Sequence, residues 1–142
     1  MSQEIRKKLS ANDVGETGGH QAGILVPKAR EILAFFPELL SGAKNPRARF
    51  VMRERSDGTR WEFNFIYYNN RMFGGTRNEY RLTCMTQYLR SIQARVGDEL
   101  VFSADENASY VVNLARAGRT MPLVNDEGTL VLGGGWTVIN IR

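Results

Sequence analysis

The sequence predicts a mainly β protein with two short helices, arranged as an antiparallel barrel or sandwich. Several short stretches alternate apolar and polar residues, and Gly, Asp and Asn turn signals separate them, which is typical of short strands joined by turns. Only two stretches space their apolar residues as a helix does. The 142 residues are 42% hydrophobic and 24% charged, as in ordinary globular proteins, so we expect residues 1–142 to form a single domain.

The first elements along the chain are a basic arm, a polar loop, a short strand and a helix. Residues 1–8 end in three basic residues, and residues 10–20 are rich in turn formers, so we expect an arm followed by a structured loop. Residues 23–26 are apolar and predict a strand. Residues 28–40 carry apolar side chains at helical spacing, and Pro37 shortens the helix.

A hairpin follows, with strands at residues 48–55 and 61–67 around an Asp-Gly turn. The first strand turns a row of arginines to one face, namely Arg47, Arg49, Arg53 and Arg55. We expect this arginine row to be solvated, although it could also follow a phosphate backbone. The second strand places four aromatic residues on one face, namely Trp61, Phe63, Phe65 and Tyr67. Their alternation opposite a polar face favours a core position over stacking on unpaired bases.

The remaining elements are mostly strands. We expect a short strand at residues 80–82 and a helix at residues 86–94. Strands are then expected at residues 99–104, 109–114, 129–132 and 136–141.

Arginine dominates the positive charge of the chain. Nineteen basic residues against 15 acidic ones give a net charge of +4, and 15 of the 19 are arginine. Residues 1–95 hold 16 of the basic residues. Because the planar guanidinium group binds phosphate and guanine with two hydrogen bonds, nucleic acid is the first partner to consider. The base composition of the gene could produce the same arginine excess.

Catalytic motifs are missing from the sequence. None of the four lysines has an acidic residue two positions before it, so the acidic-x-Lys motif of metal-dependent nucleases is absent. The single histidine, His20, excludes paired HxK motifs and histidine-based zinc sites. No G-x-S-x-G elbow presents a nucleophilic serine. We therefore expect no catalytic residue, metal or cofactor in this chain.

Three further features are interpreted as structural. Cys84 is the single cysteine, so it excludes an internal disulfide, suits a reducing compartment and is expected to be a buried thiol. The acidic pairs at residues 98–99, 105–106 and 126–127 are expected in solvated turns. Glycines 133–135 lack the Lys-Ser/Thr of a phosphate loop and predict a turn or bulge.

Arg77, Glu79 and Arg81 alternate, so in an extended segment their side chains share one face. Arginine donates two hydrogen bonds to O6 and N7 of guanine, and glutamate accepts one from N4 of cytosine. The pattern therefore suits G·C pairs read in the major groove. A row of surface ion pairs is the alternative.

Two longer motifs resemble the N-terminal effector domain of EcoRII-type restriction endonucleases. The first lies in residues 10–23, SANDVGETGGHQAG, and the second in residues 67–81, YYNNRMFGGTRNEYR. The close resemblance covers roughly residues 5–27 and 66–83. In addition, residues 96–102 are similar to the Gly-Asp strand entry of the plant B-three DNA-binding domain, which shares that fold.

The resemblance implies a seven-stranded DNA-binding pseudobarrel that grips the major groove of double-stranded DNA with two arms, at a site such as CC(A/T)GG. Carried over position by position, the candidate DNA-binding residues of the first arm are Lys7, Lys8, Ser10, Asn12, Asp13 and His20. Those of the second arm are Arg77, Asn78, Glu79, Tyr80 and Arg81. For His20, a loop-stabilising role is the alternative.

The sequence also departs from the family pattern. Gly75 and Tyr80 stand where the family has lysine, and Leu25 stands where it has tyrosine. Two phosphate-neutralising charges are missing as a result, which predicts a weaker dependence of binding on salt.

We therefore expect a sequence-specific binder of double-stranded DNA that is not itself an enzyme, acting as the effector domain of a type II restriction endonuclease with a separate nuclease domain. With no signal peptide and no apolar run near the roughly 20 residues that span a membrane, we expect a cytoplasmic protein. With no dimerisation helix, we expect a monomer. The alternatives are a stand-alone transcription regulator of the same fold, a single-stranded DNA or RNA binder, and a protein-interaction barrel.

Overall fold

The computed structural model of the chain describes residues 3–15, 23–104, 107, 109–117, 129–131 and 133–140. In chain order its elements are β1 (Gln3–Lys8), β2 (Ile24–Val26), α1 (Arg30–Leu33), β3 (Arg47–Glu54), β4 (Arg60–Tyr68), the 3₁₀ helix η1 (Asn70–Phe73), β5 (Glu79–Thr83), α2 (Thr86–Ser91), β6 (Glu99–Ala104), β7 (Tyr110–Ala115), β8 (Thr129–Val131), the 3₁₀ helix η2 (Gly133–Gly135) and β9 (Trp136–Asn140).

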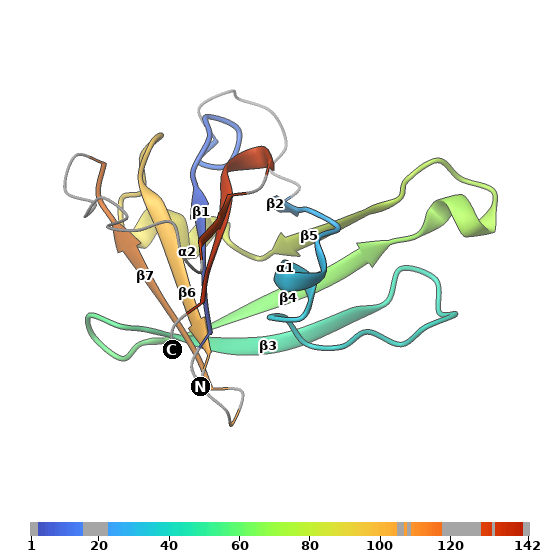
Figure 1. Cartoon of the computed structure of the whole chain (residues 1–142), viewed down its shortest axis with the longest axis horizontal. Helices are drawn as coiled ribbons and strands as arrows, with labels where there is room; N and C mark the ends of the chain where they lie inside the picture. The colour runs from blue at the N-terminus through green and yellow to red at the C-terminus, as the bar shows by residue number, and fades with distance from the viewer. Residues whose placement is uncertain are drawn as a thin grey trace.

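Within the described residues, nine strands form one sheet in the order β2-β5-β4-β3-β7-β6-β1-β9-β8. Neighbouring strands are antiparallel except β3 and β7, which run parallel. The sheet is strongly curled: β3, β4 and β5 cross the molecule, and β1, β6 and β7 stand upright beside them (Figure 1). The β4–β5 hairpin protrudes far to one side, with η1 at its tip.

The predicted mainly β fold with two short helices is confirmed, with two differences. The described part of the sheet has nine strands instead of seven, and the segment expected as a basic arm contains strand β1. The alternation of β1 is concealed because a lysine occupies an inward position. Ile5 and Lys7 are only 0% and 5% exposed. A charged residue at a core position breaks the apolar pattern by which strands are recognised.

Both predicted helices are present and both are shorter than expected. Helix α1 has four residues and ends at Leu33, before Pro37, which cannot continue a helix. Phe35 and Phe36 nevertheless pack into the core beyond the end of the helix. Helix α2 ends at Ser91, and two residues later Gln93 adopts a left-handed backbone conformation with φ of 53°.

The hydrophobic core includes the aromatic face predicted for β4. Phe63 and Phe65 are buried, and Phe65 stacks on Phe36 with ring centroids 4.8 Å apart. Trp61 is half-buried and packs edge-on against Tyr88. Because these rings pack inside the sheet, this face of β4 offers no open row of aromatic rings for unpaired bases. On the opposite face, the arginine row of β3 is exposed, and Arg49 pairs with Glu62 at 2.9 Å.

Two sequence interpretations are wrong. Cys84 is exposed instead of buried, because it lies in the turn between β5 and α2 with a left-handed φ of 65°. Asp98 is 4% exposed instead of solvated, because three donors surround its carboxylate. The expected glycine turn is confirmed within residues 133–135, where Gly134 and Gly135 both have positive φ.

Candidate nucleic-acid interface

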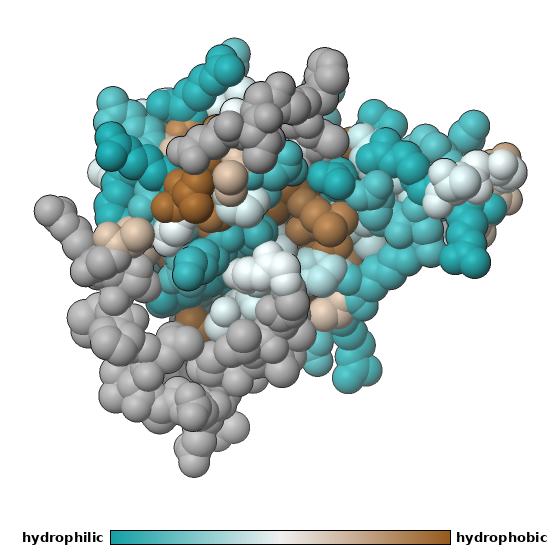
Figure 2. Space-filling view, turned by 90° about the horizontal axis from the view of Figure 1, so that it is seen from above, coloured by the Kyte–Doolittle hydropathy of each residue, from teal (hydrophilic) through white to brown (hydrophobic). Residues whose placement is uncertain are grey.

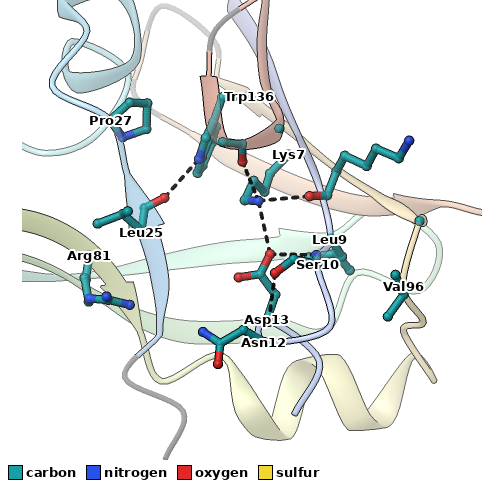
Figure 3. Close-up of a pocket in the computed structure, with 14 residues that line it drawn as sticks. Lys7, Leu9, Ser10, Asn12, Asp13, Leu25, Pro27, Arg81, Val96 and Trp136 are labelled. Atoms are coloured by element: carbon teal, nitrogen blue, oxygen red, sulfur yellow. Dashed lines mark hydrogen bonds and ion pairs between the residues drawn. The ribbon is translucent and has the colours of Figure 1, made fainter. Parts of the chain in front are cut away.

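Two polar segments flank an open groove. The first arm is the loop of residues 7–20, of which residues 7–15 are described, and the second arm is residues 71–81 of the β4–β5 hairpin. The groove has a volume of about 770 Å³ and is lined by residues of the first arm and by Arg81 at the base of the second arm (Figure 3). Seen from above, the molecule exposes hydrophobic side chains near its centre, whereas the protruding hairpin is mostly hydrophilic (Figure 2).

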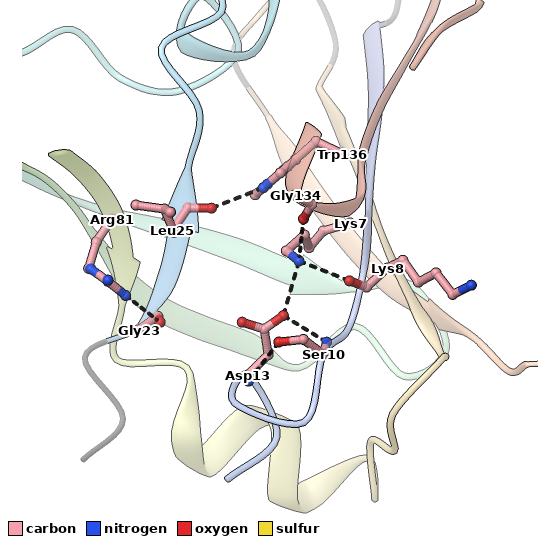
Figure 4. Close-up of polar contacts among 9 residues, drawn as sticks. All are labelled: Lys7, Lys8, Ser10, Asp13, Gly23, Leu25, Arg81, Gly134 and Trp136. Atoms are coloured by element: carbon pink, nitrogen blue, oxygen red, sulfur yellow. Dashed lines mark hydrogen bonds and ion pairs between the residues drawn. The ribbon is translucent and has the colours of Figure 1, made fainter. Parts of the chain in front are cut away.

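Lys7 lies inside the base of the first arm. Its ammonium group donates hydrogen bonds to the carbonyl oxygens of Gly134, at 2.7 Å, and Lys8, at 2.9 Å. It also pairs with Oδ2 of Asp13 at 3.1 Å (Figure 4). The charge of Lys7 is therefore used within the protein, whereas the side chain of Lys8 is exposed and lines the groove.

Ser10 and Asp13 close the first turn of the arm on itself. The backbone N–H of Ser10 donates to Oδ2 of Asp13 at 2.9 Å, and the backbone N–H of Asp13 donates to Oγ of Ser10 at 3.2 Å. This reciprocal pattern is that of a capping box, which fixes a tight turn. Asp13 thus joins the turn of the arm to Lys7 on strand β1.

Asp98 holds the base of the first arm from the other side. Its carbonyl oxygen accepts from the backbone N–H of Leu9 at 2.8 Å. Its carboxylate accepts from the backbone N–H groups of Arg95 and Ala117 and from Nη1 of Arg116. Burial raises the pKa of Asp98, but these hydrogen bonds outweigh it and hold the pKa below its usual value of 3.8. The carboxylate therefore stays ionised and keeps the turn in place.

Asn69, the residue before η1, fastens the protruding hairpin near its tip. This buried side chain donates to the carbonyl oxygen of Ala43 at 2.7 Å and accepts from the backbone N–H of Asn45 at 2.7 Å. Further along the hairpin, the backbone N–H of Arg71 donates to the carbonyl oxygen of Arg77 at 2.9 Å. The two sides of the hairpin are therefore also connected close to its tip.

Gly75 has a structural reason to replace the lysine of the family pattern. A Cβ atom at this position would lie 2.8 Å from Cβ of Asn70, closer than real Cβ contacts. The tight return of the chain after η1 therefore requires glycine at this point.

The predicted row of Arg77, Glu79 and Arg81 is present on one face of the second arm. Nε of Arg77 donates to one carboxylate oxygen of Glu79 at 3.1 Å, and Nε of Arg81 donates to the other at 2.8 Å. Nη1 of Arg81 also donates to the carbonyl oxygen of Gly23 at 3.2 Å. The guanidinium carbon of Arg77 lies 3.7 Å from the ring centre of Tyr68. Each guanidinium group is thus held by two contacts.

The ionisation of Glu79 follows from these contacts. Partial burial raises its pKa, but the hydrogen bonds and charges of Arg77 and Arg81 outweigh burial and hold the pKa below the usual 4.5. Glu79 is therefore a carboxylate at neutral pH. As a carboxylate it accepts hydrogen bonds only, which is the state that accepts from an amino group of a base.

Asn78 and Tyr80 alternate with this row. Tyr80 stacks between Phe65 and Tyr67, with centroid distances of 5.6 and 4.3 Å, and burial raises its pKa. Asn78 accepts a hydrogen bond from the hydroxyl group of Tyr67. These two residues shape the second arm from its aromatic side.

The groove brings together part of the predicted set. Its lining includes Lys7, Lys8, Ser10, Asn12, Asp13 and Arg81. Arg77, Asn78, Glu79 and Tyr80 continue along the second arm beyond the groove. The predicted contact at His20 lies outside the described residues.

Leu25 and Trp136 are among the groove residues that the sequence interpretation did not include in the site. The indole N–H of Trp136 donates to the carbonyl oxygen of Leu25 at 3.0 Å, across 111 positions of the chain. No local pattern predicts a contact of this kind. Ile24, Leu25 and Val26 are all apolar, so the sequence carried no signal that Leu25 is exposed; the structure shows it, since only the outer two are buried.

Neither a metal centre nor a membrane helix is found in the described part of the chain. No group of three or more His, Cys, Asp or Glu residues in that part could hold a metal ion. Likewise, none of its helices has the length and apolar character to cross a membrane.

The amino-acid sequence of residues 3–113 matches the protein family described as restriction endonuclease EcoRII, N-terminal. The chain belongs to this family. The resemblance of the two arm motifs is thereby confirmed. The type II restriction enzyme EcoRII of Escherichia coli is 43% identical over 79 residues, which are 54% of this chain and 19% of that protein.

The EcoRII N-terminal domain is also similar to plant proteins. Auxin response factor 5 of Arabidopsis thaliana is 30% identical over 113 residues, which are 80% of this chain and 11% of that protein. The chain therefore spans about a fifth or less of the length of these relatives.

Two solved structures share the fold of this EcoRII N-terminal domain. The Arabidopsis FUS3–DNA complex superposes with a TM-score of 0.62 at 20% identity, covering 80% of this chain and 96% of that one. The B3 domain of the UbaLAI restriction endonuclease, solved with cognate DNA, superposes with a TM-score of 0.58 at 22% identity, covering 82% and 69%. The chain thus has the B3 fold.

Proposed function

We propose that this chain is a single DNA-binding domain that binds double-stranded DNA sequence-specifically, with the duplex held against the groove between its two arms. Family membership and the DNA-bound relatives of the same fold support the proposal. The charge distribution agrees with it, since 16 of the 19 basic residues lie in residues 1–95, which supply both arms.

The observation that carries the proposal is the row of Arg77, Glu79 and Arg81. Their side chains share one face of a protruding hairpin. The carboxylate of Glu79 is fixed between two guanidinium groups, so a hydrogen-bond acceptor lies between two donors along the row. Arginine pairs with guanine and glutamate with the amino group of cytosine, so the row is suited to G·C pairs in the major groove. Arg77 uses Nε for Glu79, and its two terminal nitrogens are those that donate end-on to guanine.

The first arm sets the position of the domain on the duplex in this proposal. Lys8 is exposed beside the groove and supplies a charge for a phosphate, and Asn12 and His20 complete the predicted contacts. In this proposal Lys7 and Asp13 shape the arm by pairing with each other. Their direct contact with DNA stays a prediction.

The target site and the biological context rest on the family. We propose a short pseudo-palindromic target resembling CC(A/T)GG and a role as the non-catalytic effector domain of a type II restriction endonuclease, bound as a monomer. EcoRII is about five times longer than the matched segment, which leaves room for a separate nuclease domain. A stand-alone transcription regulator is the second candidate, favoured by the similarity to auxin response factor 5. A reading frame that continues into an acidic-x-Lys nuclease domain would decide against it.

Binding to labelled duplexes at fixed salt tests the proposal. A duplex that carries CC(A/T)GG is compared with one of the same composition in which the site is permuted. We expect the wild-type chain to prefer the first by at least about tenfold, and Arg77→Ala and Glu79→Ala each to lose about 1–3 kcal/mol of this discrimination. Arg49→Ala, in the exposed arginine row of β3, is the matched control and should keep it. Equal binding of both duplexes by the wild-type chain would contradict the proposal.

A further inference from the structure

An exposed leucine stands in the groove on an otherwise buried strand. Leu25 is the central residue of β2 and is 50% exposed, whereas Ile24 and Val26 on either side of it are buried. An apolar side chain exposed in a groove flanked by Lys8 and Arg81 is not explained by phosphate binding, which calls for cations and hydrogen-bond donors.

The backbone around Leu25 is fixed from two sides. Its carbonyl oxygen accepts from the indole N–H of Trp136 at 3.0 Å. Strand β2 pairs with β5, and Leu25 lies directly opposite Arg81 in this register. Arg81 in turn donates to the carbonyl oxygen of Gly23, two residues before Leu25 (Figure 4). The Cβ atom of Leu25 is therefore held at a set distance from the Cβ atom of Arg81.

That distance is comparable to the spacing of base pairs. Side chains opposite each other on antiparallel strands have Cβ atoms about 4.5–5.5 Å apart, and successive base pairs are about 3.4 Å apart along the helix axis. If Arg81 binds a guanine, Leu25 reaches the base pair next to it. The apolar feature in the major groove is the methyl group on C5 of thymine, and apolar side chains contact it.

We propose that Leu25 is a specificity-determining residue that contacts the C5 edge of the pyrimidine next to the guanine bound by Arg81. This inference rests on the proposed DNA-binding function and adds a contact that reads a methyl group instead of a hydrogen-bonding group. Val96, the other exposed apolar residue of the groove, lies across it from Leu25 and has no such register with Arg81 (Figure 3).

A scan of single methyl groups tests the inference. In a duplex with the preferred site, each thymine is replaced in turn by uracil, which removes the methyl group and keeps base pairing, and each cytosine by 5-methylcytosine. We expect the wild-type affinity to change about fourfold at one pyrimidine, the value of one buried methyl group. Leu25→Ala should abolish the change at that pyrimidine only. Leu40→Ala, also exposed but outside the groove, should leave it unaltered.

The outcomes separate this inference from the proposed function. If the wild-type chain prefers the target duplex but responds equally to every methyl change, or if Leu25→Ala responds as the wild-type chain does, Leu25 does not read a pyrimidine and only this inference is wrong. If the wild-type chain has no preference for the target duplex, the proposed function fails as well. Because Leu25 is half exposed, Leu25→Ala should keep the thermal stability of the wild-type chain, which a melting curve checks.

Discussion

Lys7 and Asp13 form an ion pair of 3.1 Å at the base of the first arm, and both side chains are 7% exposed. The pair links strand β1 to the turn that follows it, and Lys7 extends the link to Gly134 in the C-terminal part of the chain. Desolvation of both charges offsets much of the attraction within a buried ion pair, so we expect this pair mainly to fix one arrangement of the chain. Here the arrangement fixed is the position of the first arm beside the groove.

Removing one partner of this pair should destabilise the fold. In Lys7→Met the buried carboxylate of Asp13 loses its partner, so we expect the free energy of unfolding to fall by roughly 3–5 kcal/mol. Urea denaturation at neutral pH measures the change. A variant as stable as the wild-type chain would show that the pair does not hold the arm.

The neighbouring lysine should behave in the opposite way. Lys8 is exposed, so Lys8→Met should leave stability within about 0.5 kcal/mol of the wild-type value. If Lys8 neutralises one phosphate, the slope of log affinity against log salt concentration should become shallower by about 0.9. Titrations at several salt concentrations measure this slope. An unchanged slope would exclude Lys8 from the phosphate contacts.

Tyr68 should orient Arg77 for base recognition. The guanidinium group lies 3.7 Å from the ring centre, and such contacts contribute about 0.5–1 kcal/mol at exposed sites. We expect Tyr68→Leu to weaken binding of the target duplex about two- to fivefold and to leave binding of a permuted duplex unchanged. Tyr68→Phe keeps the ring and should restore the wild-type value. If both variants bind alike, stacking on Arg77 has no role.

The carboxylate of Asp98 should make the free energy of unfolding depend on pH in the acid range. Its pKa in the folded chain is below the usual 3.8, despite the raising effect of burial, because the backbone N–H groups of Ala117 and Arg95 and the guanidinium group of Arg116 favour the carboxylate. The stabilisation is therefore fully present above about pH 4 and is lost as the pH falls below it. Unfolding measured from pH 3 to 7 should show this loss in the wild-type chain and a smaller loss in Asp98→Asn. Identical pH profiles would contradict this role of Asp98.

The sequence predicted those features that depend on local pattern. The alternation of Phe63 with Phe65 identified the core face of β4, and that of Arg77 with Glu79 identified the polar face of the second arm. Strand β1 was missed because Lys7 occupies an inward position. Strand β1 pairs with β6 and β9, which lie far along the chain, and this pairing explains why its inward residues are buried.

Long-range contacts were out of reach of the sequence pattern. Trp136 meets Leu25 across 111 positions, and Asp98 accepts from Ala117 across a hairpin. The sequence contains the donors and acceptors but does not indicate which of them meet. For the same reason Asp98 was expected in a solvated turn, whereas in the fold three donors surround its carboxylate.

The binding of guanine by the second arm can be tested most directly with 7-deazaguanine. This base lacks the N7 acceptor and keeps Watson–Crick pairing. Each guanine of the target duplex is replaced in turn, and affinities are measured for the wild-type chain, Arg77→Ala and Arg81→Ala. We expect a loss of about 1–3 kcal/mol for the wild-type chain at the guanines that the two arginines bind. Each variant should be insensitive at its own guanine. A wild-type affinity that is unchanged by every replacement would show that the second arm does not bind guanine through N7.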